Sequence, residues 1–192
     1  MSDRTKEQFA AFKLPLVLIG AIWAAFLVDL LVPLRGLLAL VPRTAGGARG
    51  IVGMPFAHLN FQHLIANTVP LLVLSALLVA VGRGWRSVVL IALLNGALLW
   101  TFGRPAAHIG ASGLVYGLAG LLLVLGAVER KLLPILASVL VAVLYGGALW
   151  SGVLPTQEGV SWDGHLTGAI AGGIVAVKTP RGKTGTGKAH NA

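Results

Sequence analysis

The sequence predicts an all-α membrane protein, a bundle of six transmembrane helices, and three observations lead to that prediction. Hydrophobic residues make up 56% of the 192 residues and charged residues only 11%, whereas about a quarter of the residues in soluble domains are charged. The mean hydropathy is +0.86. Six apolar stretches each approach the roughly 20 residues that cross a bilayer, so little of the chain is left for a soluble domain.

The six spans form a predicted core over residues 14–178, between a polar leader (1–13) and a flexible basic tail (179–192). The first span is too long for the apolar core of a signal peptide and no small-residue cleavage site follows it, so we expect it to be retained. The connection over residues 33–60 is long and rich in Gly and Pro, which indicates turns. The predicted spans are 14–32, 61–81, 85–102, 111–128, 132–152 and 162–178.

The basic residues are distributed unevenly across this topology. Eleven of the fifteen Lys and Arg residues fall on the side of the two termini, and the positive-inside rule places that side in the cytoplasm. We therefore expect a multi-pass protein of the plasma membrane with both termini cytoplasmic. This orientation accounts for most of the net charge of +9, so we expect the lipid bilayer as a partner and no nucleic acid. The absence of cysteine excludes disulfides, thiolate metal sites and a cysteine nucleophile.

Polar side chains gather where the even-numbered spans begin. His58, His63 and Asn67 lie at or just before the start of the second span, Ser112 at the start of the fourth and His165 at the start of the sixth. All even-numbered spans begin on the outer side, so these residues share one leaflet. Strongly polar groups at membrane depth usually face a cavity or one another, which makes this set the candidate site.

Each of these residues also has a plainer interpretation when it is taken alone. His58 could be exposed in a loop. His63 and Asn67 are four residues apart on one helix face, and such a pair could simply hydrogen-bond between helices. Two further histidines, His108 in a short loop and His190 in the tail, receive no role.

Together the polar residues suit amide hydrolysis by a serine. The Ser112 hydroxyl needs a base to accept its proton, and His165 is the candidate because the pKa of histidine lies near neutrality. The oxyanion that forms needs donors, which His63, Asn67 and the backbone N–H groups at the start of the fourth span can supply. No metal or other cofactor is required, and we expect none.

Two glycine strips predict close packing of the fourth and sixth spans, which a hydrogen bond between Ser112 and His165 would require. Tyr116, four residues after Ser112 and on the same helix face, could stack on the His165 ring and fix its orientation. Asp163, two residues before His165, is expected to face away from it. The strips are Gly113, Gly117 and Gly120 in one span and Gly164, Gly168 and Gly172 in the other.

These motifs resemble those of the rhomboid intramembrane serine proteases. The resemblance rests on His58-x4-His63-x3-Asn67, on Gly110-Ala111-Ser112-Gly113 with Tyr116, and on Gly164-His165 with Gly168 and Gly172. It implies a Ser112–His165 dyad in a water-filled cavity that opens to the outside. It also implies an oxyanion hole of His63, Asn67 and the Ser112 N–H. For His58 it implies a structural hydrogen-bonding role.

The loop before the second span departs from the family pattern. Many bacterial members carry a Trp-Arg pair there, whereas residues 42–50 contain no tryptophan. The sequence therefore does not predict the usual membrane-dipping form of the loop. We expect a minimal six-helix core of the bacterial type, without an extra amino-terminal domain or a seventh helix.

The expected activity is endopeptidase cleavage of single-span membrane proteins in or near their transmembrane helix. An intact helix hides its carbonyls in its own hydrogen bonds, so we expect substrates whose helices unwind easily. By analogy, a gate around the second and fifth spans would open sideways. The alternatives are a non-catalytic rhomboid-like binder of membrane proteins, and a small transporter or haem protein that uses His63 and His165. The oligomeric state and the physiological substrate are left open.

Overall fold

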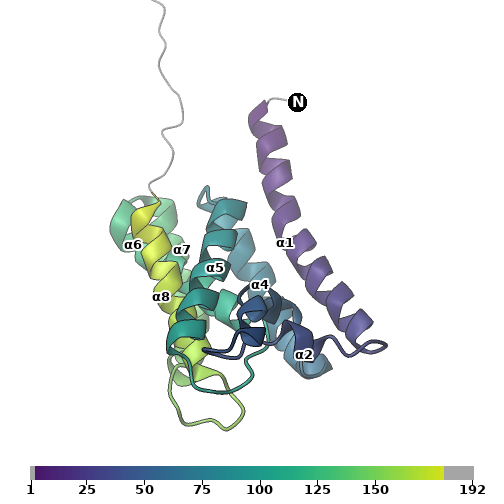
Figure 1. The fold of residues 1–192 in the computed structure, drawn as a ribbon. Coiled ribbons are helices and arrows are strands. Elements are labelled where there is room, and N and C mark those ends of the chain that lie inside the picture. Colours follow the sequence, from purple (N-terminus) through teal and green to yellow (C-terminus); the bar gives the residue numbers. More distant parts are fainter. Residues whose placement is uncertain (1–2, 180–192) are drawn as a thin grey trace, which may run out of the picture.

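The computed structural model describes residues 3–179, and over this range the chain is helical apart from its connections (Figure 1). An isolated antiparallel bridge between Leu40 and His108 is the β-type pairing found there. The described long helices are α1 (Asp3–Asp29), α4 (Phe61–Ala80), α5 (Trp85–Phe102), α6 (Ser112–Glu129), α7 (Leu132–Gly152) and α8 (Trp162–Lys178). Short helices α2 (Arg35–Leu38), η1 (Gly46–Arg49), α3 (Gly50–Gly53) and η2 (Met54–Phe56) occupy the connection from α1 to α4.

The helices from α4 to α8 begin and end within one residue of the predicted spans. The first helix does not, because α1 already begins at Asp3 and includes most of the predicted polar leader. That segment lacks an apolar run, but it contains Ala, Glu and Lys, which favour helix. The predicted tail and His190 lie almost entirely outside the described residues.

Four of the described helices, α4 to α7, are long and apolar enough to cross a membrane, with mean hydropathies between 1.5 and 2.3. A multi-pass membrane protein is therefore supported by length and composition. Helix α8 has 17 residues, which is near the lower end of the length that spans a bilayer. The count of six crossings stays a prediction.

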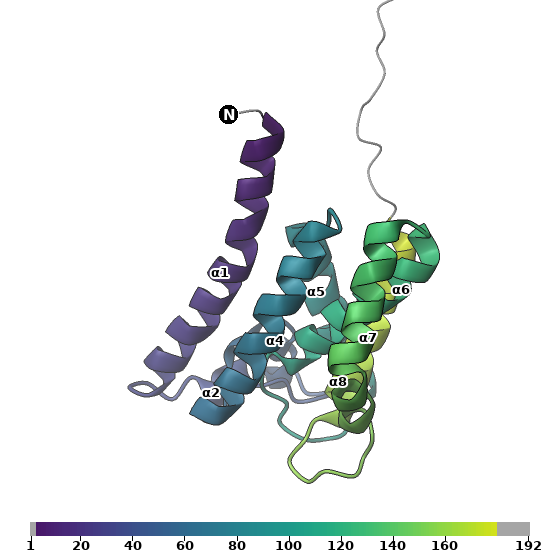
Figure 2. The same ribbon diagram turned by 180° about the vertical axis from the view of Figure 1, so that it is seen from behind.

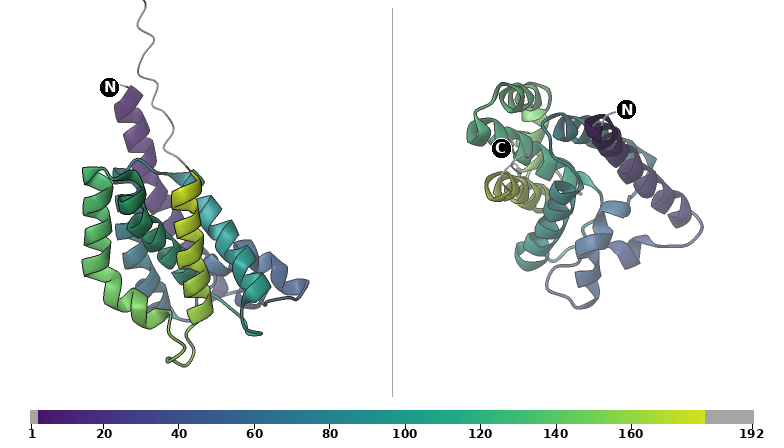
Figure 3. Two further views of the ribbon diagram at one scale, coloured as in Figure 1. Left: turned by 90° about the vertical axis from the view of Figure 1, so that its left-hand side faces the viewer. Right: turned by 90° about the horizontal axis from the view of Figure 1, so that it is seen from above.

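Helix α6 is the most buried of these four helices and α7 the least. Helix α6 packs most extensively along α8 and also contacts α4, α5 and α7 (Figure 2). Helix α1 lies at the edge of the bundle (Figure 3), where the Trp23 ring meets Phe61 of α4 edge-on at 5.9 Å. The start of α1 and the end of α8 lie at the same end of the bundle.

The glycine strips bring α6 and α8 together as the sequence predicts. A Cβ at Gly168 would collide with the carbonyl oxygen of Gly113, and a Cβ at Gly172 with that of Gly117. The backbones therefore approach more closely than any side chain would allow, as small residues permit in membrane bundles. This approach places the first turn of α8 beside the first turn of α6.

The two ends of the bundle are fastened by different contacts. At the end where α6 begins, the Arg43 guanidinium donates to the Gly103 carbonyl at 2.8 Å, and this contact joins the α1–α4 connection to the end of α5. At the opposite end, Arg83 forms a buried ion pair with Glu129 at 2.9 Å. Arg83 also donates to Thr179 Oγ1 at 2.7 Å, so this contact joins the α4–α5 connection to the ends of α6 and α8.

Candidate active site

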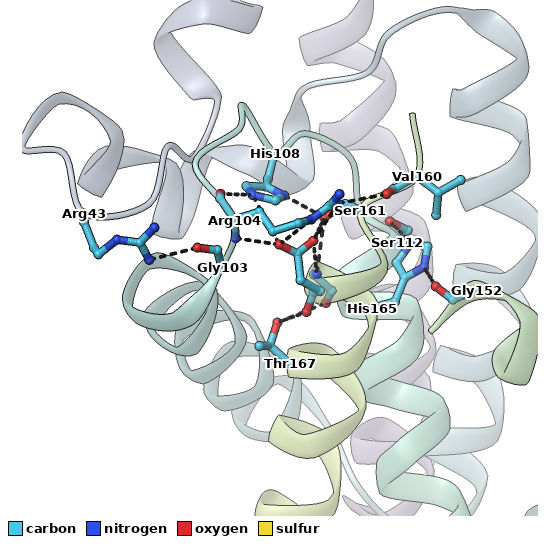
Figure 4. A network of polar contacts seen from close by, with 12 residues as sticks. Arg43, Gly103, Arg104, His108, Ser112, Gly152, Val160, Ser161, His165 and Thr167 are labelled. Atoms are coloured by element: carbon cyan, nitrogen blue, oxygen red, sulfur yellow. Dashed lines mark hydrogen bonds and ion pairs between the residues drawn. The ribbon is translucent and has the colours of Figure 1, made fainter. Parts of the chain in front are cut away.

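Ser112 and His165 meet where α6 and α8 begin. The Ser112 Oγ lies 2.9 Å from Nε2 of His165, within hydrogen-bonding distance (Figure 4). Gly110 precedes this turn with φ +106, a value that side chains other than glycine rarely adopt. A Cβ at Gly110 would lie 2.7 Å from the His63 ring, so glycine is required here both for its conformation and for space.

The proton position on His165 follows from its second contact. His165 Nδ1 lies 2.8 Å from the carbonyl oxygen of Gly152, the last residue of α7. A carbonyl only accepts, so Nδ1 carries the hydrogen and Nε2 is left to accept from the Ser112 hydroxyl. The sequence did not reveal Gly152, because a backbone carbonyl carries no side-chain signal.

The Tyr116 ring stacks on the His165 ring, as the sequence suggests. The Tyr116 and His165 rings are 4.1 Å apart and nearly parallel, at 5°. The Tyr116 hydroxyl donates to the Ala148 carbonyl at 2.9 Å, and a Cβ at Gly152 would collide with that hydroxyl. The last turn of α7 therefore holds both rings through backbone carbonyls.

His63 and Asn67 extend from successive turns of α4 towards the same place. The Leu59 N–H donates to His63 Nδ1 at 3.4 Å, so the neutral ring carries its hydrogen on Nε2 and presents a donor there. Asn67 is 3% exposed, and its amide donates one hydrogen to the His63 carbonyl at 3.0 Å. An amide nitrogen carries two hydrogens, so Asn67 can also donate to a ligand in the cavity.

These four side chains and Tyr116 line one cavity of about 580 Å³. Its remaining walls are mostly small or apolar residues. They come from the first turns of α4, from the last turns of α7 and from the connections before α6 and α8. A cavity with apolar walls and a few convergent polar groups is typical of a ligand or substrate site. The wall residues include Leu59, Ala66, Pro70, Ile109, Val115, Tyr145, Ala148 and Leu149.

His58 lies behind His63, outside the lining of this cavity. Its side chain is 1% exposed, and its ring centre lies 5.2 Å from that of His63. Within the described residues neither ring nitrogen makes a hydrogen bond of regular geometry, although the Phe56 backbone acts on the ring, so the hydrogen-bonding role implied by the resemblance stays a prediction. Burial, and secondarily His63, lower the pKa of His58 from 6.5 to about 4, although the Phe56 backbone opposes the shift. His58 is therefore a neutral ring that packs against His63.

A second group of polar residues, which the sequence did not identify as functional, lies beside the dyad. His108, left without a role by the sequence, is buried, and its Nδ1 lies 2.7 Å from Ser161 Oγ. Asp163 faces away from His165, as predicted, and pairs with Arg104 at 3.2 Å. Arg104 and Asp163 are 59 positions apart, and no local pattern links them.

Comparisons with known proteins agree with this architecture. A family model described as Rhomboid domain matches residues 45–181. Uncharacterised proteins of Mycobacterium bovis and Mycobacterium tuberculosis are 40% identical over 146 residues, which is 70% of this chain and 60% of theirs. One of Mycobacterium leprae is 40% identical over 149 residues, 70% of this chain and 58% of its own. The chain spans about 60% of the length of these relatives, and it belongs to the rhomboid family.

Proposed function

We propose that the protein is an intramembrane serine endopeptidase in which Ser112 is the nucleophile and His165 the general base. The observation that carries the proposal is the 2.9 Å hydrogen bond between Ser112 Oγ and His165 Nε2. A serine hydroxyl becomes a competent nucleophile only when a neighbouring base can take its proton. The Gly152 carbonyl holds His165 in the tautomer that can do so.

The proposed reaction proceeds in two stages. The Ser112 oxygen attacks the scissile carbonyl carbon while His165 Nε2 takes the hydroxyl proton. The resulting oxyanion accepts hydrogen bonds from His63, Asn67 and the Ser112 backbone N–H. His165 then gives its proton to the leaving amine as the C–N bond breaks. A water molecule, deprotonated by His165, hydrolyses the acyl-enzyme and restores Ser112.

The proposed substrates are single-span membrane proteins that place an unwound segment in the cavity. Backbone carbonyls within a regular helix are already hydrogen-bonded, so cleavage requires residues that leave the helix readily, such as Gly, Ala, Ser or Pro. Ala66 and Ala148 line the cavity from α4 and α7, and such small lining residues leave room for a peptide backbone. We place the protein in the plasma membrane with the cavity at the outer face and both termini in the cytoplasm.

The test uses protein purified in detergent and a single-span substrate with a small-residue, helix-breaking segment. We expect wild type to cleave it and Ser112→Ala and His165→Ala to be inactive. Ser87→Ala is the matched control, because Ser87 is a buried serine near the opposite end of the bundle. Its activity should equal that of wild type.

A fluorophosphonate probe supplies a readout that does not depend on the choice of substrate. We expect it to label wild type and Ser87→Ala but not Ser112→Ala. Equal cleavage by wild type and Ser112→Ala would refute the proposal. A wild type that neither cleaves nor labels would favour the non-catalytic binder.

A further inference from the structure

Arg104 and Asp163 join the loop before α6 to the first turn of α8. The Arg104 backbone N–H donates to Asp163 Oδ2 at 2.8 Å, and its guanidinium donates to the same carboxylate from Nε at 3.3 Å and from Nη2 at 3.2 Å. Asp163 is 6% exposed. A carboxylate this deeply buried is costly unless it is paired and hydrogen-bonded, so these contacts hold the two segments together.

His108 and Ser161 complete this group, which we call the outer polar cluster (Arg104, His108, Ser161 and Asp163). The His108 ring lies between the Arg104 carbonyl, 3.1 Å from Nε2, and the Ser161 hydroxyl, 2.7 Å from Nδ1 (Figure 4). Ser161 in turn donates to Asp163 Oδ1 at 3.2 Å and caps α8 by accepting from the Gly164 N–H.

The position of the cluster along the chain connects it with the dyad. The loop that contains Arg104 and His108 continues directly into the turn that carries Ser112. Asp163 lies two residues before His165, and its side chain points away from that ring to Arg104. No hydrogen bond joins the Asp163 carboxylate to Ser112 Oγ or His165 Nε2 among the described contacts, so its proposed route to the dyad runs through the backbones of the loop and of α8.

The same cluster reaches the segment that carries the proposed oxyanion donors. The His108 backbone pairs with Leu40 through two hydrogen bonds, of 2.8 and 3.0 Å. The Leu40 segment leads through the short helices to the start of α4, where His63 lies. The outer polar cluster and the Leu40–His108 pairing thus join the segments that carry the proposed nucleophile, base and oxyanion donors.

We propose that Asp163 is a positioning residue for His165, held in place by Arg104 and by Ser161, which His108 contacts in turn. The inference rests on the proposed function. The cluster fixes the first turn of α8, both its position along the helix axis and its rotation about that axis. It thereby fixes the 2.9 Å separation of Ser112 Oγ and His165 Nε2. A displacement of about 1 Å in a reacting pair can cost about 100-fold in rate, so loss of the Asp163 contacts should reduce chemistry rather than substrate binding.

The test compares Asp163→Asn and Asp163→Ala with wild type. Asp163→Asn retains the side-chain volume and an acceptor for the Arg104 N–H but loses the charge. We expect kcat to fall about 10-fold in Asp163→Asn and about 100-fold in Asp163→Ala, with KM unchanged. The rate of fluorophosphonate labelling of the folded protein should fall in the same order, because labelling also needs an activated Ser112.

Arg104 provides the second half of the experiment. Arg104→Ala should lower kcat, and Arg104→Lys should restore part of it. Because Arg104→Ala removes the guanidinium contacts and Asp163→Ala removes the same contacts from the other side, the two effects should be less than additive in the double variant.

Glu129→Gln is the matched control for a purely structural effect. It breaks the buried ion pair with Arg83 at the far end of α6 and α8, so it should lower the melting temperature without slowing the labelling of folded protein. Asp163 variants that label at the wild-type rate, or additive effects in the double variant, would overturn the positioning role alone. A wild type that does not label at Ser112 would overturn the proposed function as well.

Discussion

At the scale of single residues, one backbone partner distinguishes His165 from His63, although both line the cavity. His165 donates from Nδ1 to the Gly152 carbonyl and therefore presents an acceptor at Nε2. His63 accepts at Nδ1 from the Leu59 N–H and therefore presents a donor at Nε2. The two side chains are chemically identical, yet the first is suited to take a proton and the second to stabilise an oxyanion.

Replacement of Asn67 tests the proposed oxyanion hole. We expect Asn67→Ala to lower kcat by roughly 10- to 1,000-fold, as loss of a single oxyanion donor does elsewhere. Steady-state cleavage of the single-span substrate measures this change. Asn95→Ala is the comparison, because Asn95 is equally buried but bonds to Thr167 outside the cavity, so its main effect should be on stability. An unchanged kcat in Asn67→Ala would remove Asn67 from the hole.

Replacement of Tyr116 separates ring stacking from hydrogen bonding. Tyr116→Phe keeps the ring on His165 and loses the bond to the Ala148 carbonyl, so we expect reduced but measurable cleavage. Tyr116→Ala loses both contacts and should be much less active. If Tyr116→Phe were as inactive as Tyr116→Ala, the hydroxyl and not the ring would orient the base.

The buried His58 gives the folded protein a specific sensitivity to acid. Its pKa is about 4 in the folded protein, against an ordinary value of 6.5. Between these values the unfolded chain binds the proton and the folded one does not, so stability is lost as pH falls from about 6.5 towards 4. We expect the melting temperature in detergent to fall over this window, and to fall less in His58→Asn. An equal fall in both proteins would exclude His58 as the cause.

At the scale of helices, the contact between α6 and α8 permits almost no added volume. We expect Gly168→Ala or Gly172→Ala to force these helices apart, because each new Cβ would meet a carbonyl of α6. Overpacking typically costs about 1–3 kcal/mol, and the melting temperature should fall together with the cleavage rate. Gly20→Ala in α1 is the control, since nothing lies within 4 Å of its added Cβ. Equal stability of all three variants would contradict the proposed close packing.

The helices were largely predictable, because each is marked by a run of neighbouring residues in the sequence. Apolar runs bounded by Gly, Pro and charged residues define α4 to α8 within one residue. The start of α1 was missed because polar residues in a helix leave no apolar signal. Ser112 and His165 were predictable because each begins a span on the same side. Gly152 was not predictable, because it acts through a backbone carbonyl. The Arg104–Asp163 pair was not predictable, because the two residues are 59 positions apart.

At the scale of the whole molecule, the orientation in the membrane can be tested directly because the chain has no cysteine. Single cysteines at exposed loop positions can then be labelled with a membrane-impermeant maleimide in intact cells. We expect Thr156→Cys, in the α7–α8 connection, to label without permeabilisation. Lys131→Cys, in the α6–α7 connection, should label only after it. The reverse pattern would place the cavity on the cytoplasmic side.

The contact of His165, the proposed base, with α7 has a consequence for the order of substrate entry and cleavage. The Ala148 and Gly152 carbonyls hold Tyr116 and His165, and α7 is the least buried of the four apolar helices. If a substrate enters between α4 and α7 by pushing α7 outwards, the same movement withdraws both carbonyls. The open form would then admit substrate without being able to cleave it. Hydrolysis would begin only after α7 had moved back to its position beside Tyr116 and His165. Cleavage would then be limited to substrate segments that remain in the cavity until α7 has moved back.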